Sequence, residues 1–248
     1  MKIYSGIEII EPYPAIYIED LEAVVIADLH LGYEGIMAEK GIFLPKTQFK
    51  KEMEMLLEIF KKKKARRVII NGDIKHEFSE TSYHEFKEVR DMLAFLKTKC
   101  EEVILIKGNH DNYIARVSNR FGVKLYDELE LGDYHFLHGH RAPITLKAKY
   151  LIMAHEHPAV TLYDEVGGKE KLNCLLYGDC EYAGGVRRIA VLPAFSTLAM
   201  GSEVNFIPKQ ELLSPILREI DVEKLRVIGI SFELGCLDFQ ELGRLRFI

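Results

Sequence analysis

Residues 24–30 are Val-Val-Ile-Ala-Asp-Leu-His, an apolar run that stops at an aspartate and a histidine. The run is mostly β-branched and predicts a short strand buried on both faces. Asp28 and His30, which follow at once, carry side chains that bind metal ions. A buried strand that leads into ligand-type residues indicates a site at the carboxyl end of that strand.

The same transition occurs four more times along the chain. The apolar runs 68–70, 103–106, 134–137 and 151–154 lead into Asn71-Gly72-Asp73, Gly108-Asn109-His110-Asp111, His138-Gly139-His140 and His155-Glu156-His157. Because the carboxyl ends of strands in open α/β sheets converge on one crevice, we expect the five sets to meet at one edge. The ordered set carries this prediction, since each short motif taken alone is common by chance.

The candidate ligands are seven carboxylate, amide and imidazole side chains: Asp28, His30, Asp73, Asn109, His138, His155 and His157. Imidazole and carboxylate together suit manganese, zinc, iron, nickel or cobalt, whereas calcium and magnesium prefer oxygen alone. Seven ligands are too many for one ion, so they predict two divalent ions roughly 3.5–4 Å apart. Asp73 is the expected bridging carboxylate, because an aspartate after a strand and a glycine can approach both ions.

The pattern around these motifs predicts the fold. Apolar stripes predict one helix at 49–60 and another at 86–96, the second capped by Ser82 and Glu85. Strand–helix alternation in the first half predicts parallel pairing. Beyond Arg120 short strands dominate, at 128–131, 134–137, 150–153, 160–163, 172–177, 188–192 and 227–232, with a short helix at 210–219. We expect an α/β fold, a four-layer αββα sandwich of two mixed β-sheets flanked by helices, as a single domain over 1–248.

Composition bounds the class of protein. The chain has 248 residues, 48% apolar and 29% charged, which predicts a folded globular protein. The formal net charge of -5 excludes a globally basic nucleic-acid binder, although a local basic patch stays open. No apolar run is long enough for a membrane span, and the N-terminus shows no secretory signal. The four cysteines have no C-x-x-C spacing, so we expect a cytoplasmic protein without membrane association.

The ordered motifs from Asp28 to His157 resemble the calcineurin-like metallophosphoesterase superfamily. In detail the chain looks most like archaeal SbcD-related phosphoesterases and the metallophosphoesterases associated with DNA ligases. The segments Pro193-Ala194-Phe195-Ser196 and Gly201-Ser202-Glu203-Val204-Asn205 resemble that subgroup as well. Two positions depart from the superfamily pattern. Ala154 stands where a glycine is usual, and residues 74–77 lack the aspartate and arginine of the protein-phosphatase branch, which disfavours a protein-phosphatase substrate.

The resemblance implies a role for each position. Asp28, His30 and His157 would hold the first metal, Asp73 would bridge, and the second metal would be held by Asn109, His138 and His155. It also implies hydrolysis by a metal-bridging water, with His110 as the catalytic histidine beside the leaving group. Asp111, His76 and Glu77 are candidates for the group that orients His110. Arg141 is a candidate for gripping a substrate phosphate, with a surface salt bridge as the alternative.

The expected function is a two-metal phosphodiesterase or nuclease that acts on nucleic acid, such as single-stranded DNA, or on nucleotides. The alternatives are a small-molecule phosphomonoesterase or cyclic-nucleotide phosphodiesterase, and a non-catalytic binding protein on the same fold. Manganese is the expected cofactor, with zinc, iron, nickel and cobalt as alternatives. A homodimer is left open by the apolar C-terminal end, which includes Leu245 and Phe247.

Overall fold

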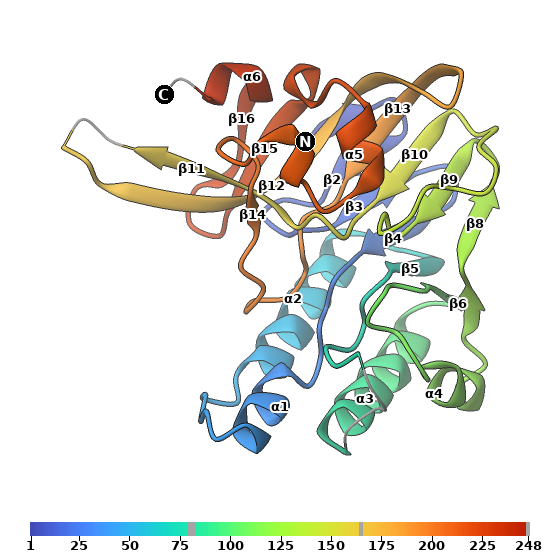
Figure 1. The fold of residues 1–248 in the computed structure, drawn as a ribbon. Helices are drawn as coiled ribbons and strands as arrows, with labels where there is room; N and C mark the ends of the chain where they lie inside the picture. The colour runs from blue at the N-terminus through green and yellow to red at the C-terminus, as the bar shows by residue number, and fades with distance from the viewer. Residues whose placement is uncertain (79–82, 164–165, 247–248) are drawn as a thin grey trace.

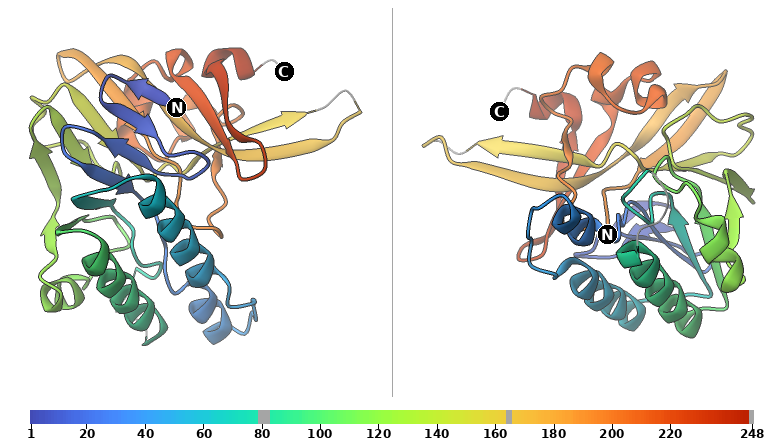
Figure 2. Two further views of the ribbon diagram at one scale, coloured as in Figure 1. Left: turned by 180° about the vertical axis from the view of Figure 1, so that it is seen from behind. Right: turned by 60° about the horizontal axis from the view of Figure 1, so that its bottom comes forward.

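The computed structural model describes residues 1–78, 83–163 and 166–246. Two β-sheets pack face to face, and helices cover the outer face of each (Figure 1). Helices α2 and α3 lie side by side under the first sheet, which the view from below shows (Figure 2, right). The order of layers is therefore helix, sheet, sheet, helix, as the sequence predicts.

Seven strands form the first sheet, in spatial order from β1 to β7. Their bounds are β1 Lys2–Tyr4, β2 Ile7–Ile9, β3 Ile16–Ile18, β4 Ala23–Ile26, β5 Arg67–Asn71, β6 Glu102–Ile106 and β7 Lys124–Tyr126. Strands β1 to β4 pair antiparallel, and β4 to β7 pair parallel. The parallel pairing brings the ends of β4, β5 and β6 to the same edge.

The second sheet is built mainly from the later half of the described chain. Its strands are β8 Glu128–Leu131, β9 Tyr134–Leu137, β10 Tyr150–Met153, β11 Pro158–Tyr163, β12 Lys169–Tyr182, β13 Gly185–Val191, β14 Ser202–Glu203, β15 Arg226–Ser231 and β16 Gly235–Glu241. The main order is β14-β11-β12-β13-β10-β9-β8, while β15 pairs with β12 and β16. Strands β9 and β10 are parallel neighbours, so their ends lie together too.

The helices flank these sheets at sites that their sequences explain. They are α1 Tyr33–Glu39, α2 Gln48–Lys62, α3 Tyr83–Lys99, α4 Ala115–Arg120, α5 Pro215–Glu219 and α6 Leu242–Leu245, with 3₁₀ turns η1 Lys209–Glu211 and η2 Val222–Lys224. Helix α2 buries Met55, Leu56 and Ile59 and ends in Lys61 and Lys62, where cations suit the negative end of the helix dipole.

Three separate apolar cores account for the four layers. One core lies between the sheets and joins Val25 and Ile69 of the first sheet to Phe136 and Ile152 of the second. Another packs the first sheet against α2, α3 and α4, and a third packs the second sheet against α5 and α6. Because β4 is covered on both faces, all four of its residues are buried, which explains its continuous apolar sequence.

The predicted strands all overlap observed ones, and 128–131, 134–137 and 150–153 agree at both ends. The expected helix at 210–219 is wrong as a single element. It is split into η1 and α5, because Pro215 lacks an amide hydrogen and disfavours a helical residue before it. The Ser82 half of the predicted capping box lies outside the described residues. Within the part of the chain that the structure describes, no helix is both long and apolar enough to cross a membrane.

Candidate metal centre

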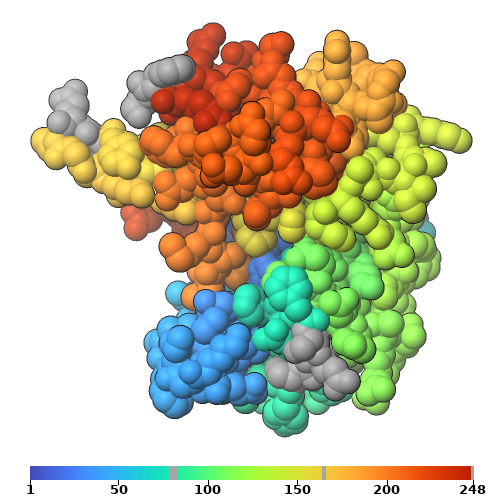
Figure 3. Space-filling view, in the orientation of Figure 1, coloured from blue at the N-terminus to red at the C-terminus, as the bar shows by residue number. Residues whose placement is uncertain are grey.

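The loops that follow β4, β5, β6, β9 and β10 carry the seven candidate ligands. Asp28 and His30 follow β4, Asp73 follows β5, and Asn109 follows β6. The other three, His138, His155 and His157, follow β9 and β10 of the second sheet. The site therefore lies where the edges of the two sheets meet. On the face shown in Figure 3, the orange segment near residue 200 lies against the blue segment near residue 40, although the two are far apart in the sequence.

Asp28, His30 and His157 form one group of side chains that can hold a metal ion. The Nε2 atoms of His30 and His157 lie 3.3 Å apart. The Oδ1 atom of Asp28 lies 3.2 Å from the His157 Nε2 atom. Three ligand atoms that converge in this way, with Asp28 fully buried, fit a divalent cation between them.

Asp73, His138 and His155 form a second such group. The Nε2 atom of His138 lies 3.2 Å from Asp73 Oδ2 and 3.1 Å from Asn109 Oδ1. The other ring nitrogen of His138, Nδ1, lies 3.1 Å from the carbonyl oxygen of Asn71 and donates to it. This contact fixes the tautomer in which Nε2 is free to bind a metal.

Asn71 connects the two sheets directly beneath the ligands. Its side-chain amide donates to the carbonyl oxygens of Leu137, at 3.0 Å, and Ile152, at 3.2 Å. Asn71 belongs to β5, whereas Leu137 and Ile152 belong to β9 and β10. A buried amide with these partners holds the two halves of the centre in register.

Five of the seven candidate ligands have a left-handed backbone: Asp28 at φ 54°, His30 at 49°, Asp73 at 50°, His155 at 69° and His157 at 46°. Such angles are uncommon for residues with a side chain and persist only where the surroundings enforce them. The concentration of this strain at one place is typical of a functional site. Ala154 is absent from the positive-φ residues of the described chain, so an alanine fits where the superfamily has a glycine.

Electrostatics in the metal-free chain pair the carboxylates with imidazoles. Burial penalises the charge of Asp73, but the adjacent His138 outweighs this effect and holds the pKa of Asp73 below its usual range. Burial likewise disfavours a charged His138, yet Asp73 and Asp28 raise its pKa to about 9. Burial lowers the pKa of His30 to about 3 and that of His155 to about 4, so both are neutral at pH 7 and can act as ligands.

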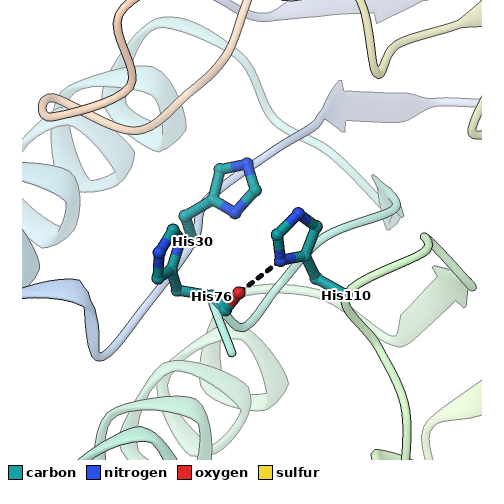
Figure 4. Close-up of side chains that lie close together, drawn as sticks. All are labelled: His30, His76 and His110. Carbon is teal, nitrogen blue, oxygen red and sulfur yellow. Dashed lines mark hydrogen bonds between the residues drawn. The ribbon is translucent and has the colours of Figure 1, made fainter. Parts of the chain in front are cut away.

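His110 lies at the edge of this cluster. Its Nε2 atom is 3.8 Å from Asp73 Oδ2, and its backbone amide donates to Asp73 Oδ1 at 2.9 Å. Its Nδ1 atom makes a short contact with the carbonyl oxygen of His76, drawn as a dashed line in Figure 4. The ring of Phe78 covers the imidazole, with the two ring centroids 3.7 Å apart.

The side chain of Asp111, one candidate for orienting His110, has other partners. Its carboxylate accepts the backbone amides of Gly108 at 2.9 Å, Asp73 at 2.8 Å and Ile74 at 3.0 Å. Burial, together with the charge of Asp73, raises the pKa of Asp111 to about 7. Asp111 therefore holds the loops after β5 and β6 together, while the His76 carbonyl oxygen contacts the His110 ring.

Arg141 lies at the surface, where its Nη2 atom is 3.4 Å from Asp127 Oδ1. Its side chain is 45% exposed. The sequence leaves two roles open for Arg141, a substrate phosphate contact and a surface salt bridge. The ion pair with Asp127 is the second of these, and phosphate binding by Arg141 stays a prediction.

The roles of several buried polar residues around the centre are missed by sequence reasoning. The Gln48 amide donates to the carbonyl oxygens of Leu29 and His30, which holds the loop after β4. Lys75 is fully buried, and its ammonium donates to the carbonyl oxygen of Glu77. Glu85 is fully buried and accepts the backbone amides of His76 and Glu77. Each lies in a helix or loop where a polar residue is ordinarily exposed, so the sequence gives little signal for them.

A two-sheet sandwich with paired Asp and His groups at its strand ends has the architecture of a metal-dependent phosphoesterase. The sequence profile of the calcineurin-like phosphoesterase family matches residues 22–175, and the chain belongs to this family. It is a hydrolase that acts on phosphoester bonds. No curated protein matches this chain.

Among solved structures, the Pseudomonas putida nuclease MPE is similar in fold, with a TM-score of 0.63 and 20% sequence identity. The match covers 90% of this chain and 92% of that chain. Yfce, a phosphoesterase from E. coli, has a TM-score of 0.38 and 16% identity, with coverage of 84% and 87%. The first likeness supports the fold, and the second is too weak to carry an argument.

Proposed function

We propose that the chain is a two-metal phosphodiesterase that hydrolyses nucleic acid or nucleotide phosphodiesters. The observation that carries the proposal is the pair of three-residue ligand groups, each of which draws residues from both sheets. Asp28, His30 and His157 would hold one ion, and His138, His155 and Asn109 the other. Asp73, whose carboxylate contacts His138 and His110, would bridge them. Manganese remains the expected metal.

When bound, the ions supply Lewis acidity toward a phosphate and a water of lowered pKa. The protein supplies the proton for the leaving oxygen. In the protonated imidazole of His110, Nδ1 donates to the His76 carbonyl oxygen. Nε2 then gives its proton to the leaving alkoxide oxygen as the bond from that oxygen to phosphorus breaks, which releases the alcohol. Phe78 covers one face of the ring and limits access of water to it.

A nucleic-acid substrate is supported by the nuclease among the structural neighbours. Membership of the SbcD-related and ligase-associated subgroup is proposed from the sequence motifs alone. Exposed aromatic side chains on the loops beside the centre, Phe78 and Tyr113, offer faces on which bases can stack. We also infer a cytoplasmic location, from cysteine spacing without a disulfide framework, and keep the homodimer as a prediction.

The test is hydrolysis of labelled single-stranded DNA and of an aryl phosphodiester with added Mn²⁺. We expect wild type to cleave both, and His110→Ala to lose about 10²- to 10⁴-fold in kcat on DNA. His84→Ala, which removes a histidine of α3 outside the ligand groups, is the control and should retain the rate. Cleavage of neither substrate with any divalent metal, despite metal binding, would point to a narrow small-molecule phosphatase or a binding protein.

Arg141→Ala is expected to raise KM for DNA several-fold and to weaken the dependence of binding on salt, because one phosphate contact is lost. Asp127→Asn removes the surface ion pair but keeps the arginine, so it serves as the matched control. If both variants leave KM and its salt dependence unchanged, Arg141 takes part only in a surface salt bridge, which is worth about 0–1 kcal/mol.

A further inference from the structure

We propose that Glu85 is a positioning residue for His110, which it orients through the backbone carbonyl of His76. This inference rests on the proposed function, because it concerns the residue that positions His110, the proton donor of that reaction. In the protein-phosphatase branch the stretch after Gly-Asp carries an aspartate, whereas Ile74-Lys75-His76-Glu77 stands here. In this structure the main-chain oxygen of His76 contacts the ring of His110. The peptide group that carries this oxygen must therefore be held in place if it is to orient the ring.

The His76 carbonyl group belongs to a loop with a single β-bridge, which pairs Lys75 with Leu31. Residues 74–78 leave β5 and lie between the loop after β4 and the start of α3. Figure 4 shows the rings of His30, His76 and His110 gathered around the carbonyl oxygen. In such a loop, the orientation of a carbonyl group depends on the hydrogen bonds that the neighbouring amides make.

Glu85 anchors two of those amides, and the His76 amide also donates to the Leu31 carbonyl oxygen at 3.2 Å. The Oε1 atom of Glu85 accepts the His76 amide at 3.1 Å and the Glu77 amide at 2.6 Å. The Glu77 amide and the His76 carbonyl oxygen belong to one planar peptide group, so the bond to the Glu77 amide orients this carbonyl group directly. The bond to the His76 amide fixes the peptide group just before it. A charged acceptor makes these bonds stronger than neutral ones.

The position of the Glu85 side chain is itself fixed. It is fully buried on the first turn of α3. A Cβ atom at Gly32 would lie 2.2 Å from Glu85 Cγ, so the side chain packs directly against the loop after His30. The buried Lys75 carries an opposite charge that interacts with Glu85. The carboxylate is therefore compensated and has little freedom to move.

Glu88, one turn along α3, makes the same kind of bond to the other loop. Its Oε2 atom accepts the Gly32 amide at 2.7 Å. It touches neither His76 nor Glu77 in its described hydrogen bonds, so Glu88→Ala is a matched control for loss of a carboxylate from this face of the helix.

The experiment compares two leaving groups in Glu85→Ala. A nitrophenolate leaves without a proton, whereas the alkoxide of a DNA strand needs one, so a misaimed His110 should affect only the second. We expect kcat on single-stranded DNA to fall about 10- to 100-fold, with kcat on a nitrophenyl phosphodiester and the bound manganese little changed. Glu85→Gln, which keeps an acceptor oxygen, should recover most of the loss. Glu88→Ala should show no dependence on the leaving group.

A double variant decides whether Glu85 acts through His110. In a His110→Ala background, Glu85→Ala should cost nothing further on DNA. Equal loss on both substrates, reduced metal content or an additive double variant would overturn the proposal. If Glu85→Ala does not fold, Glu85→Met, which keeps the length of the side chain but offers no acceptor oxygen, carries the same comparison.

A readout without turnover separates this inference from the proposed function. Long-range ¹H–¹⁵N spectra report which ring nitrogen of His110 carries the proton. The neutral ring should be protonated on Nδ1 in wild type, and the other tautomer should gain population in Glu85→Ala. If wild type hydrolyses neither substrate, the proposed function fails, and an unchanged tautomer in Glu85→Ala then overturns the positioning role as well.

Discussion

Asp73→Asn should abolish manganese binding at the centre and lower kcat on DNA by more than the roughly 10- to 100-fold typical of outer-shell partners. Asparagine keeps an oxygen that can accept the His110 amide, now 2.9 Å from Asp73 Oδ1, so the loop after β6 stays in place. The negative charge that His138 faces at 3.2 Å is lost. Bound metal is measured by elemental analysis of dialysed protein, and the rate by single-strand cleavage.

Thermal unfolding adds a second measure for this variant. Manganese at about 100 times its Kd should stabilise wild type by about 2.7 kcal/mol and Asp73→Asn by much less. Asp91→Asn, a surface carboxylate paired with Arg90, is the control for removal of one negative charge. A variant that still binds two equivalents of manganese would show that Asp73 is not the bridge.

Gly108→Ala should disrupt the centre from the backbone side. An added Cβ would lie 2.0 Å from Asp73 Oδ1 and 2.4 Å from the Asp73 amide nitrogen. Neither atom can move freely, because Asp73 accepts the His110 amide and its own amide donates to Asp111. We expect a loss of about 1–3 kcal/mol in stability from overpacking. We also expect loss of manganese and of cleavage, since Asp73 must be displaced.

The control for Gly108→Ala is Gly243→Ala in α6. There the nearest atoms to an added Cβ belong to Glu223, at 3.2 Å or more, and alanine favours a helix. Calorimetry and metal content should change little in Gly243→Ala. Wild-type metal content in Gly108→Ala would mean that the loop after β6 shifts without moving Asp73. That result would contradict the expectation that a Cβ atom 2.0 Å from Asp73 Oδ1 displaces this carboxylate.

The sequence predicts the layers and the placement of the candidate ligands because both depend on strong local signals. Strands β4, β5 and β6 are buried on both faces and so appear as uninterrupted apolar runs. Their polar ends stand out against those runs. The general rule that parallel strands share a carboxyl edge then predicts the convergence that the structure shows.

The first three strands and the anchoring role of Glu85 have no comparable pattern in the sequence. Strands β1, β2 and β3 have three residues each, too few for a period to be recognised, although Ile7 and Ile9 alternate with a polar residue. The anchoring role of Glu85 depends on a contact between the start of α3 and the loop after β5. Sequence suggests only a capping residue at that position, because the packing against Gly32 is a tertiary feature.

Both ligand groups include side chains from each sheet: Asp28 and His30 with His157, and Asp73 with His138 and His155. A cation held there works as a reversible cross-link between two halves that also share an apolar core and hydrogen bonds such as those of the Asn71 amide. The lifetime of the folded chain in the cell would then follow the supply of free metal. A cell short of this metal would lose the protein itself to proteolysis, and not only its activity.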